Sequence, residues 1–423
     1  MLKKLIIHHF KSLENVEIDF SNITVFVGNN ASGKSNVIDA IRLVRDAVSN
    51  GLDRAIGDRH GIESVRQWSP TKPYRMSFTI LFDEEVTFRG RYHFAIDSAR
   101  SEFRVAREEA EIYERGVSHQ VTTDKETGKP RIFERPQHTK KALIRDIKGD
   151  AEFTEWKVTA PIGDDTPFNV TMFCQSPTSF DRKPNKRKLK ISQSDELFLN
   201  LRAHVWEFGS LRSRLSGFQA YSIFPNTLRI PQDPSNETFL APEGRNLASV
   251  FKRMRRTPQG TAAINQITEA MQSLMPNLER ISVLTVGGFL VLQFHVIEPT
   301  GKRHIFNVSQ LSDGTLRVLG LLTALYQVPK PAIIALEEPE QTVNPGILTV
   351  LADSIKEVSR RTQVLVTTHS PNLLDQFVPE TVKTVELSGG RTRVDNVNAR
   401  QIEVVKERLF SLGELLTSEG LHG

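Results

Sequence analysis

Cysteine is nearly absent from this chain of 423 residues, and so are long hydrophobic runs. The single Cys174 excludes a disulfide framework and a zinc site made of several cysteines, and it favours a reducing compartment. The longest apolar stretch, from Leu311 to Leu336, is broken by charged residues and prolines and is too polar to cross a bilayer. The N-terminus lacks the continuous apolar segment of a secretion signal. We therefore expect a cytoplasmic protein with no membrane span.

The remaining composition is that of an ordinary globular protein. Hydrophobic residues make up 39% and charged residues 25%, which argues against a collagen, a coiled rod or a disordered chain. The net charge of +5 is compatible with a polyanionic partner but does not demonstrate one. At roughly 150 residues per domain, the length fits either three domains or one domain with a large insertion.

Both ends of the chain alternate strand and helix. The β-branched run Ile23–Val27, closed by Gly28, predicts a buried strand, and apolar residues at helical spacing from Ser35 to Val48 predict a helix after it. In the last third we expect helices over 316–326 and 346–359, and buried strands over 332–336 and 363–367. This order predicts a parallel α/β sheet.

The middle of the chain has a different pattern. Residues 74–113 alternate apolar and polar with a period near two, which predicts an antiparallel meander. Apolar residues repeat every three or four positions over 196–218 and predict an amphipathic helix. Further elements are expected as helices over 246–256 and 259–274, and as strands over 280–285, 289–297 and 303–308. Between 115 and 195 we predict only short strands, such as Trp156–Thr159.

A phosphate-binding motif lies between the first buried strand and its helix. Residues 28–35 match G-x-x-x-x-G-K-[ST], in which backbone N–H groups and the helix N-terminus face phosphate oxygens. Lys34 then reaches the β- and γ-phosphates, and the Ser35 hydroxyl can bind Mg²⁺. The predicted nucleotide-binding residues are Gly28, Asn29, Asn30, Ala31, Ser32, Gly33, Lys34, Ser35 and Asn36. A purely structural glycine turn is the alternative.

Two later strands end in polar residues suited to the same chemistry. The strand at 333–336 runs into Glu337 and Glu338, and buried strands seldom end in paired acids without a cation or a reacting water. We assign Glu337 to Mg²⁺ and Glu338 to polarising the attacking water. His369 follows the next strand, at the edge where α/β sheets bind ligands, and is predicted to contact the γ-phosphate. The alternatives are a helix start decorated with negative charge and a structural histidine.

The segment Ser309–Arg317 (SQLSDGTLR) resembles the signature motif of ATP-binding-cassette ATPases, in the form found in SMC and RecF-like relatives. The resemblance covers about residues 1–95 and 280–385. It implies an α/β fold: an ABC-type ATPase head, with a P-loop parallel sheet and an antiparallel β annex, and an inserted mixed α/β lobe. The implied division is 1–100 for the N-terminal half of the head, 101–279 for the variable lobe and 280–423 for the C-terminal half.

The resemblance also implies how the site is completed. Ser312 and Gly314, with Asp313 between them, would bind the ATP held by an opposite subunit in a head-to-head homodimer. The glutamine that binds Mg²⁺ in this family is assigned to Gln67. The metal-binding acid, usually aspartate, is Glu337 here, but many relatives share the sequence EEPE, so hydrolysis of ATP is expected. Long heptad arms are missing, which excludes an SMC rod.

Three functions remain open at this stage. In the first, ATP closes the dimer and controls a separately encoded effector, such as a nuclease or toxin, in antiphage defence, as in Septu-type and overcoming-lysogenization-defect-type systems. The second is a RecF-like DNA-repair ATPase, and the third a nucleotide-gated scaffold with little turnover. A basic segment at 182–190 could bind nucleic acid or be a solvated loop.

Overall fold

The computed structural model describes residues 1–84, 88–123, 130–158, 185–191, 194–200, 208–418, 420–421 and 423. Cys174, Thr159 and the first part of the basic segment, residues 182–184, lie outside these ranges. The chain forms two compact units, one made of residues 1–19 and 43–216 and the other of residues 20–42 and 217–423. The three-part division expected from the sequence stays a prediction.

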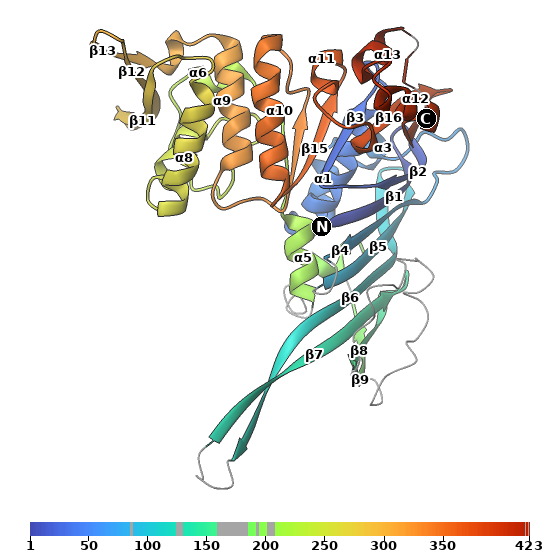
Figure 1. Cartoon of the computed structure of the whole chain (residues 1–423). Coiled ribbons are helices and arrows are strands. Elements are labelled where there is room, and N and C mark those ends of the chain that lie inside the picture. The colour runs from blue at the N-terminus through green and yellow to red at the C-terminus, as the bar shows by residue number, and fades with distance from the viewer. Residues whose placement is uncertain are drawn as a thin grey trace. The chain divides into compact units, whose positions relative to one another are not determined.

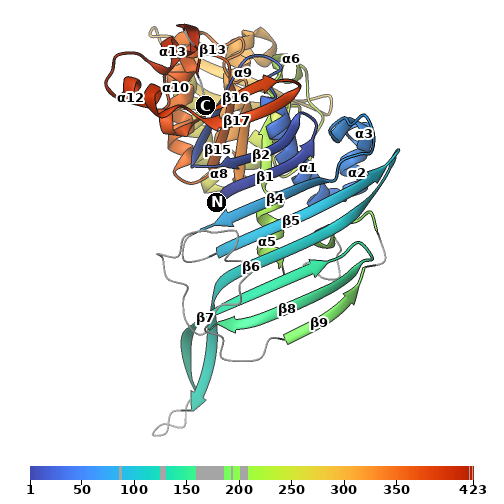
Figure 2. The same ribbon diagram turned by 90° about the vertical axis from the view of Figure 1, so that its right-hand side faces the viewer.

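Unit 1 is built on an eight-stranded antiparallel sheet, whose curved strands are clearest in Figure 2. Along the sheet the order is β2-β1-β4-β5-β6-β7-β8-β9. The strands are β1 (Leu2–Phe10), β2 (Leu13–Asp19), β4 (Met76–Asp83), β5 (Phe88–Ala99), β6 (Glu102–Thr123), β7 (Pro130–Arg145), β8 (Asp150–Val158) and β9 (Asn185–Lys190). The short helices of this unit are α2 (Leu52–Gly57), α3 (Ile62–Val65), η1 (Phe198–Asn200) and α5 (Gly209–Ser216). The antiparallel meander predicted over 74–113 is confirmed by β4, β5 and β6.

The sheet of unit 1 is larger than predicted because buried charges interrupt its apolar pattern. Glu108 is fully buried and accepts hydrogen bonds from the Tyr92 hydroxyl at 2.8 Å and the Phe198 backbone N–H at 2.8 Å. Arg145, only 1% exposed, lies 3.4 Å from the same carboxylate. Burial raises the pKa of Glu108, while these donors lower it. Paired in this way, charged residues can occupy buried positions of a strand. A search for alternating apolar and polar residues does not recognise such strands.

The predicted helix over 196–218 is confirmed only in part. Residues 209–216 form the shorter helix α5, but residues 198–200 form η1 and Phe218 begins a strand; residues 201–207 lie outside the described ranges. Phe198 and Phe208 are both buried and pack edge to face at 6.0 Å between ring centroids. The periodic apolar residues thus fill the core of unit 1 from two separate segments.

Unit 2 contains a six-stranded sheet in the order β10-β14-β15-β3-β16-β17. Its strands are β3 (Ile23–Val27), β10 (Phe218–Tyr221), β14 (Ile333–Glu337), β15 (Gln363–Thr368), β16 (Val382–Ser388) and β17 (Arg391–Asn396). The first five in spatial order run parallel and β17 pairs antiparallel with β16. The predicted parallel sheet is confirmed, with β10, β16 and β17 in addition.

Helices and a small second sheet complete this unit (Figure 1). The helices are α1 (Lys34–Asn50, which continues into unit 1), α6 (Pro225–Arg229), α7 (Leu247–Met254), α8 (Pro258–Met271), η3 (Val308–Gln310), α9 (Asp313–Tyr326), α10 (Pro345–Ser359), α11 (Pro371–Leu374), η4 (Pro379–Thr381), α12 (Ala399–Lys406) and α13 (Leu412–Ser418). The second sheet consists of β11 (Leu278–Val286), β12 (Phe289–Ile297) and β13 (Arg303–Asn307). No helix in the described ranges is long and apolar enough to cross a bilayer.

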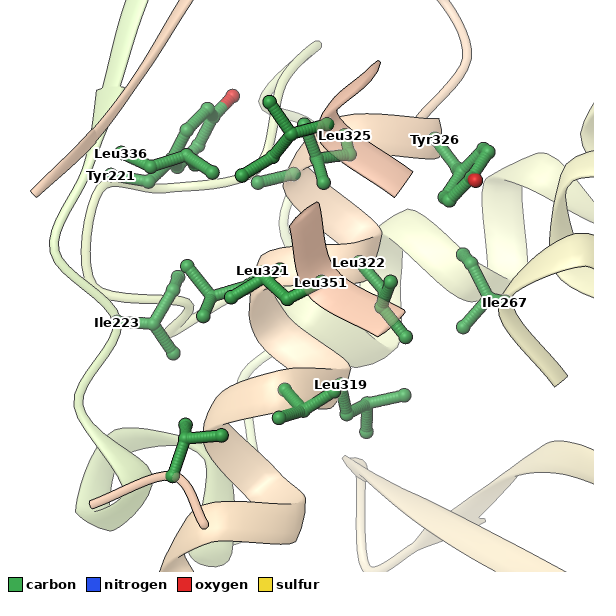
Figure 3. Packing of buried hydrophobic residues seen from close by; sticks show 14 of the residues in the cluster. Tyr221, Ile223, Ile267, Leu319, Leu321, Leu322, Leu325, Tyr326, Leu336 and Leu351 are labelled. Carbon is green, nitrogen blue, oxygen red and sulfur yellow. The ribbon is translucent and has the colours of Figure 1, made fainter. Parts of the chain in front are cut away.

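Helix α9 is the centre of the hydrophobic core of unit 2. Every residue from Leu316 to Tyr326 is buried, as expected for a helix that packs on several sides. Figure 3 shows Leu322 facing Ile267 of α8, with Leu321 and Ile223 together on another side of α9. The helix that carries the SDGT sequence is therefore rigidly embedded between the sheet and its neighbouring helices.

Leu322→Ala should lower the free energy of unfolding by about 2–5 kcal/mol, because it leaves a cavity in this core. Leu409→Ala, at a position 62% exposed, should change it by less than about 0.5 kcal/mol. Denaturant unfolding followed by circular dichroism measures both. Equal effects of the two substitutions would contradict the core described above.

Candidate nucleotide site

Three adjacent strands of unit 2 present the candidate residues at one edge of the sheet. Strands β3 and β14 both pair parallel with β15, so the three carboxyl ends meet at the same edge. Residues 28–35 follow β3, Glu337 and Glu338 stand at the end of β14, and His369 follows β15. The fold thereby brings the phosphate loop next to two motifs that follow it some 300 residues later in the sequence.

The loop after β3 has the backbone shape of an anion-binding nest. Ala31 has a φ of 61° and Gly33 a φ of 106°, so successive N–H groups can point into one concavity. A Cβ on Gly33 would lie 2.1 Å from the Thr392 hydroxyl, and one on Gly28 would lie 2.1 Å from the Val385 carbonyl oxygen. The glycines are needed both for conformation and because β16 and β17 pack directly against the loop.

Lys34 lies inside this loop. Its residue surface is 5% exposed, and its ammonium donates hydrogen bonds to the carbonyl oxygens of Gly28 at 2.7 Å and Asn29 at 3.0 Å. The same nitrogen lies 3.5 Å from a carboxylate oxygen of Glu338. A buried ammonium held mainly by carbonyl groups is well placed to exchange them for a stronger anionic acceptor, such as phosphate.

The residues around the loop fit a magnesium–nucleotide. Ser32 has a buried hydroxyl without a hydrogen-bond partner, and Ser35 is exposed at the start of α1. Oxygen donors of this kind, hydroxyl and carboxylate, are the ligands that Mg²⁺ prefers. Ser35 and Glu337 could therefore hold the ion.

Glu337 already has a partner in the described structure. Its carboxylate accepts a hydrogen bond at 2.8 Å from the guanidinium of Arg42, two turns along α1 from Ser35. A cation at Glu337 would compete with this ion pair. Arg42 was not singled out in the sequence, where only its position on the polar face of the helix marks it.

Glu338 and His369 are in direct contact. The Nδ1 atom of His369 forms a hydrogen bond with the Glu338 carboxylate, and Glu338 has a left-handed backbone with a φ of 46°. Glu340 lies close by: one of its oxygens accepts hydrogen bonds from the Thr368 hydroxyl at 2.7 Å and the His369 backbone N–H at 3.1 Å. Burial raises the pKa of Glu340. The two predicted catalytic residues are thus hydrogen-bonded to each other, and the buried Glu340 carboxylate is bound to the backbone of His369.

The SDGT segment opens α9 on a separate surface. Ser312 and Asp313 are exposed, and the Ser312 hydroxyl caps the helix by accepting from the Thr315 N–H at 3.2 Å. Arg229 braces the loop through Asp313 and the Leu311 carbonyl oxygen. In the described residues, no hydrogen bond or ion pair joins residues 312–314 to residues 28–36 of the same chain. A Cβ on Gly314 would approach the Thr342 carbonyl oxygen to 2.6 Å, which gives this glycine a packing role.

Gln67 belongs to unit 1. Its side-chain oxygen lies 2.7 Å from Nδ1 of His9, and its backbone N–H donates to the His9 carbonyl oxygen at 2.9 Å. His9 in turn stacks on Tyr74 with 4.5 Å between ring centroids. The assignment of Gln67 to Mg²⁺ stays a prediction.

The described part of the basic segment is an edge strand with paired charges. In β9, Lys186 lies 2.7 Å from Glu152 and Lys190 lies 2.8 Å from Asp150. Arg187 lies over the ring of Phe153 at 4.5 Å. Lys186 and Lys190 are thus in ion pairs, and nucleic-acid binding by the segment stays a prediction.

Comparisons with known proteins give one matching family model and several similar solved structures. Residues 23–375 match the family model described as "AAA domain, putative AbiEii toxin, Type IV TA system". No curated protein matches the chain. Solved structures that resemble it include an Smc head bound to the C-terminal winged-helix domain of ScpA, with a TM-score of 0.49 and 13% identity over 95% of this chain and 99% of the other. The SMC head domain from Thermotoga maritima gives 0.40 and 15% over 94% and 99%. An Smc head from Pyrococcus furiosus bound to the C-terminal domain of ScpA gives 0.46 and 14% over 96% and 99%.

Gly33→Ala should abolish nucleotide binding, because the added Cβ is strained at a φ of 106° and collides with Thr392. Gly57→Ala is the matched control, since nothing lies within 4 Å of its Cβ. Titration with a fluorescent ATP analogue measures both affinities. An unchanged affinity in Gly33→Ala would exclude this loop as the nucleotide site.

Proposed function

Because the chain belongs to this AAA-domain family, we propose that it binds ATP and Mg²⁺ at the carboxyl edge of its parallel sheet and hydrolyses the nucleotide. Its fold and the order of its motifs are those of an ABC/SMC-type P-loop ATPase head. The observation that carries the proposal is the chain of contacts from Lys34 through Glu338 to His369. A phosphate-binding ammonium, a carboxylate and an imidazole meet there at the end of the phosphate loop.

We assign a role to each of these groups. On nucleotide binding, Lys34 exchanges its carbonyl partners for the β- and γ-phosphates. That exchange leaves the Glu338 carboxylate available to accept a proton from the attacking water, with His369 holding it in orientation. Mg²⁺ at Ser35 and Glu337 would neutralise negative charge on the phosphates. Arg42 must release Glu337 for that purpose.

Glu338→Gln should lower the rate of phosphate release by about 100-fold or more while ATP still binds, since the amide keeps the size of the side chain but cannot accept a proton from the attacking water. Glu357→Gln, on α10, is the control and should retain the wild-type rate. Steady-state phosphate release decides the question. Equally slow rates for wild type and Glu338→Gln would reject the enzyme in favour of a nucleotide-gated scaffold.

We further propose that two copies join head to head around two nucleotides. The signature residues Ser312–Gly314 lie on the surface and have no bond to the phosphate loop of their own chain in the described residues. A helix N-terminus with two exposed polar residues suits the γ-phosphate of a nucleotide held by a second copy. Each copy would then supply one half of each site.

The dimer is proposed to control a separately encoded effector in antiphage defence, in the cytoplasm. The family description joins an AAA domain to a putative toxin of a toxin–antitoxin system, which supports a role in a system that contains a toxic component. The described part of the basic segment, with two of its lysines in ion pairs, gives less support to a DNA-repair ATPase.

A neighbouring gene product with nuclease or toxin activity should bind the wild-type protein in the presence of ATP and should bind Lys34→Ala at least about tenfold more weakly, because closure needs bound nucleotide. Co-expression followed by size-exclusion chromatography measures this difference. Equal binding to both proteins, or binding to neither, would contradict control of an effector by ATP.

A further inference from the structure

Arg317 connects the signature helix to the acidic loop through its buried guanidinium. The residue is 2% exposed and lies five positions after Ser312, in the second turn of α9. One terminal nitrogen donates to the Ile223 carbonyl oxygen at 2.8 Å, and the other donates to the Glu338 carbonyl oxygen at 2.8 Å. Burial lowers the pKa of Arg317, and the nearby carboxylates of Glu340 and Glu338 oppose that shift. Burying a cation is costly unless hydrogen bonds satisfy it, and these two carbonyl groups hold the guanidinium in one place.

The bond to Glu338 holds a strained backbone. Glu338 has a φ of 46°, a conformation that costs a non-glycine residue about 1–3 kcal/mol unless its surroundings impose it. Its N–H donates to the Thr367 carbonyl oxygen on β15 at 3.0 Å, and its carbonyl oxygen accepts from Arg317 on α9. Strand β15 therefore holds the N–H group of the proposed base, and helix α9 holds its carbonyl group.

Glu340 fixes the histidine in a similar way. It is 9% exposed, and its bonded oxygen holds both the Thr368 hydroxyl and the His369 N–H. Its other oxygen is buried without a hydrogen-bond partner, as is Nε of Arg317. Arg317 is thus bound to Glu338, Glu338 to His369, and the backbone of His369 to Glu340. An alternative use of Glu338, Glu340 and His369 as a metal site is disfavoured, because the Lys34 ammonium lies 3.5 Å from a Glu338 carboxylate oxygen and would repel a metal ion.

We infer that Arg317 and Glu340 are positioning residues that fix Glu338 and His369 for attack by water and connect them to the signature helix. This inference rests on the proposed function. When a second copy places its nucleotide on Ser312, any displacement of α9 reaches the Glu338 backbone through Arg317. Turnover then depends on engagement of the signature, although the two sites share no direct contact.

The test compares three folded variants with wild type. Arg317→Lys keeps the charge but cannot form both hydrogen bonds, to Ile223 and Glu338, in the same geometry. Glu340→Gln keeps an acceptor oxygen but removes the charge. Arg253→Lys is the matched control, because Arg253 also donates to two carbonyl oxygens, those of Glu237 and Thr238, and also has a buried Nε without a partner. It lies on α7, away from the acidic loop. Thermal unfolding establishes that each variant is folded.

We expect kcat to fall by about tenfold or more in Arg317→Lys and Glu340→Gln, as for other residues that orient catalytic groups. KM, nucleotide affinity and ATP-induced dimerisation should remain within about twofold of wild type, and Arg253→Lys should match wild type throughout. Arg317→Met should lose more activity than Arg317→Lys; if it does not fold, the lysine and glutamine variants decide.

Two results would overturn the inference alone. The first is a wild-type kcat in both Arg317→Lys and Glu340→Gln. The second is that Arg317→Lys and Arg253→Lys lose kcat, nucleotide affinity and melting temperature to the same extent. A wild-type protein without turnover would overturn the proposed function together with this inference. The wild-type rate therefore separates the two failures before any variant is compared.

Discussion

The contact between the Lys34 ammonium and the Glu338 carboxylate is the interaction on which the site depends. Both side chains are largely buried, and a buried charge without a partner is costly, so each stabilises the other at the end of the parallel sheet. The loop that holds Lys34 needs two glycines against β16 and β17, and Glu338 needs a left-handed backbone. The surrounding fold provides both conditions, because three parallel strands end at one edge.

The charged side chains of the site are all paired, and a bound nucleotide would change several of these pairs. Lys34 is bound to carbonyl groups, Glu337 to Arg42, and Glu338 to His369. Phosphate could replace the carbonyl groups at Lys34 and a metal ion could replace Arg42 at Glu337, whereas His369 stays bound to Glu338. Binding of a nucleotide would therefore release several interactions at once, and the buried network behind them, Arg317 and Glu340, would keep the reacting groups in place.

The sequence predicted the elements that carry the candidate site better than the periphery of the fold. Glycine spacing, a β-branched strand and paired acids are local signals, and Lys34, Glu338 and His369 follow β3, β14 and β15 as expected; their roles stay predictions. Arg42 and Glu340 were not assigned because their roles arise only when α1 and β15 approach the acidic loop. The helix over 196–218 was confirmed only at α5 because its apolar residues serve two segments. Strand β7 was missed and β8 was predicted only at its last residues, because charges such as Arg145 occupy interior positions.

The central claim is that two copies share each nucleotide, and mixing two inactive variants tests it most directly. Lys34→Ala and Ser312→Arg should each hydrolyse no ATP alone. Their mixture should regain about a quarter of the wild-type rate, because half of the dimers would be mixed and each would contain one intact site of two. A mixture as inactive as its components, or a Ser312→Arg protein with the wild-type rate, would contradict a site shared between subunits.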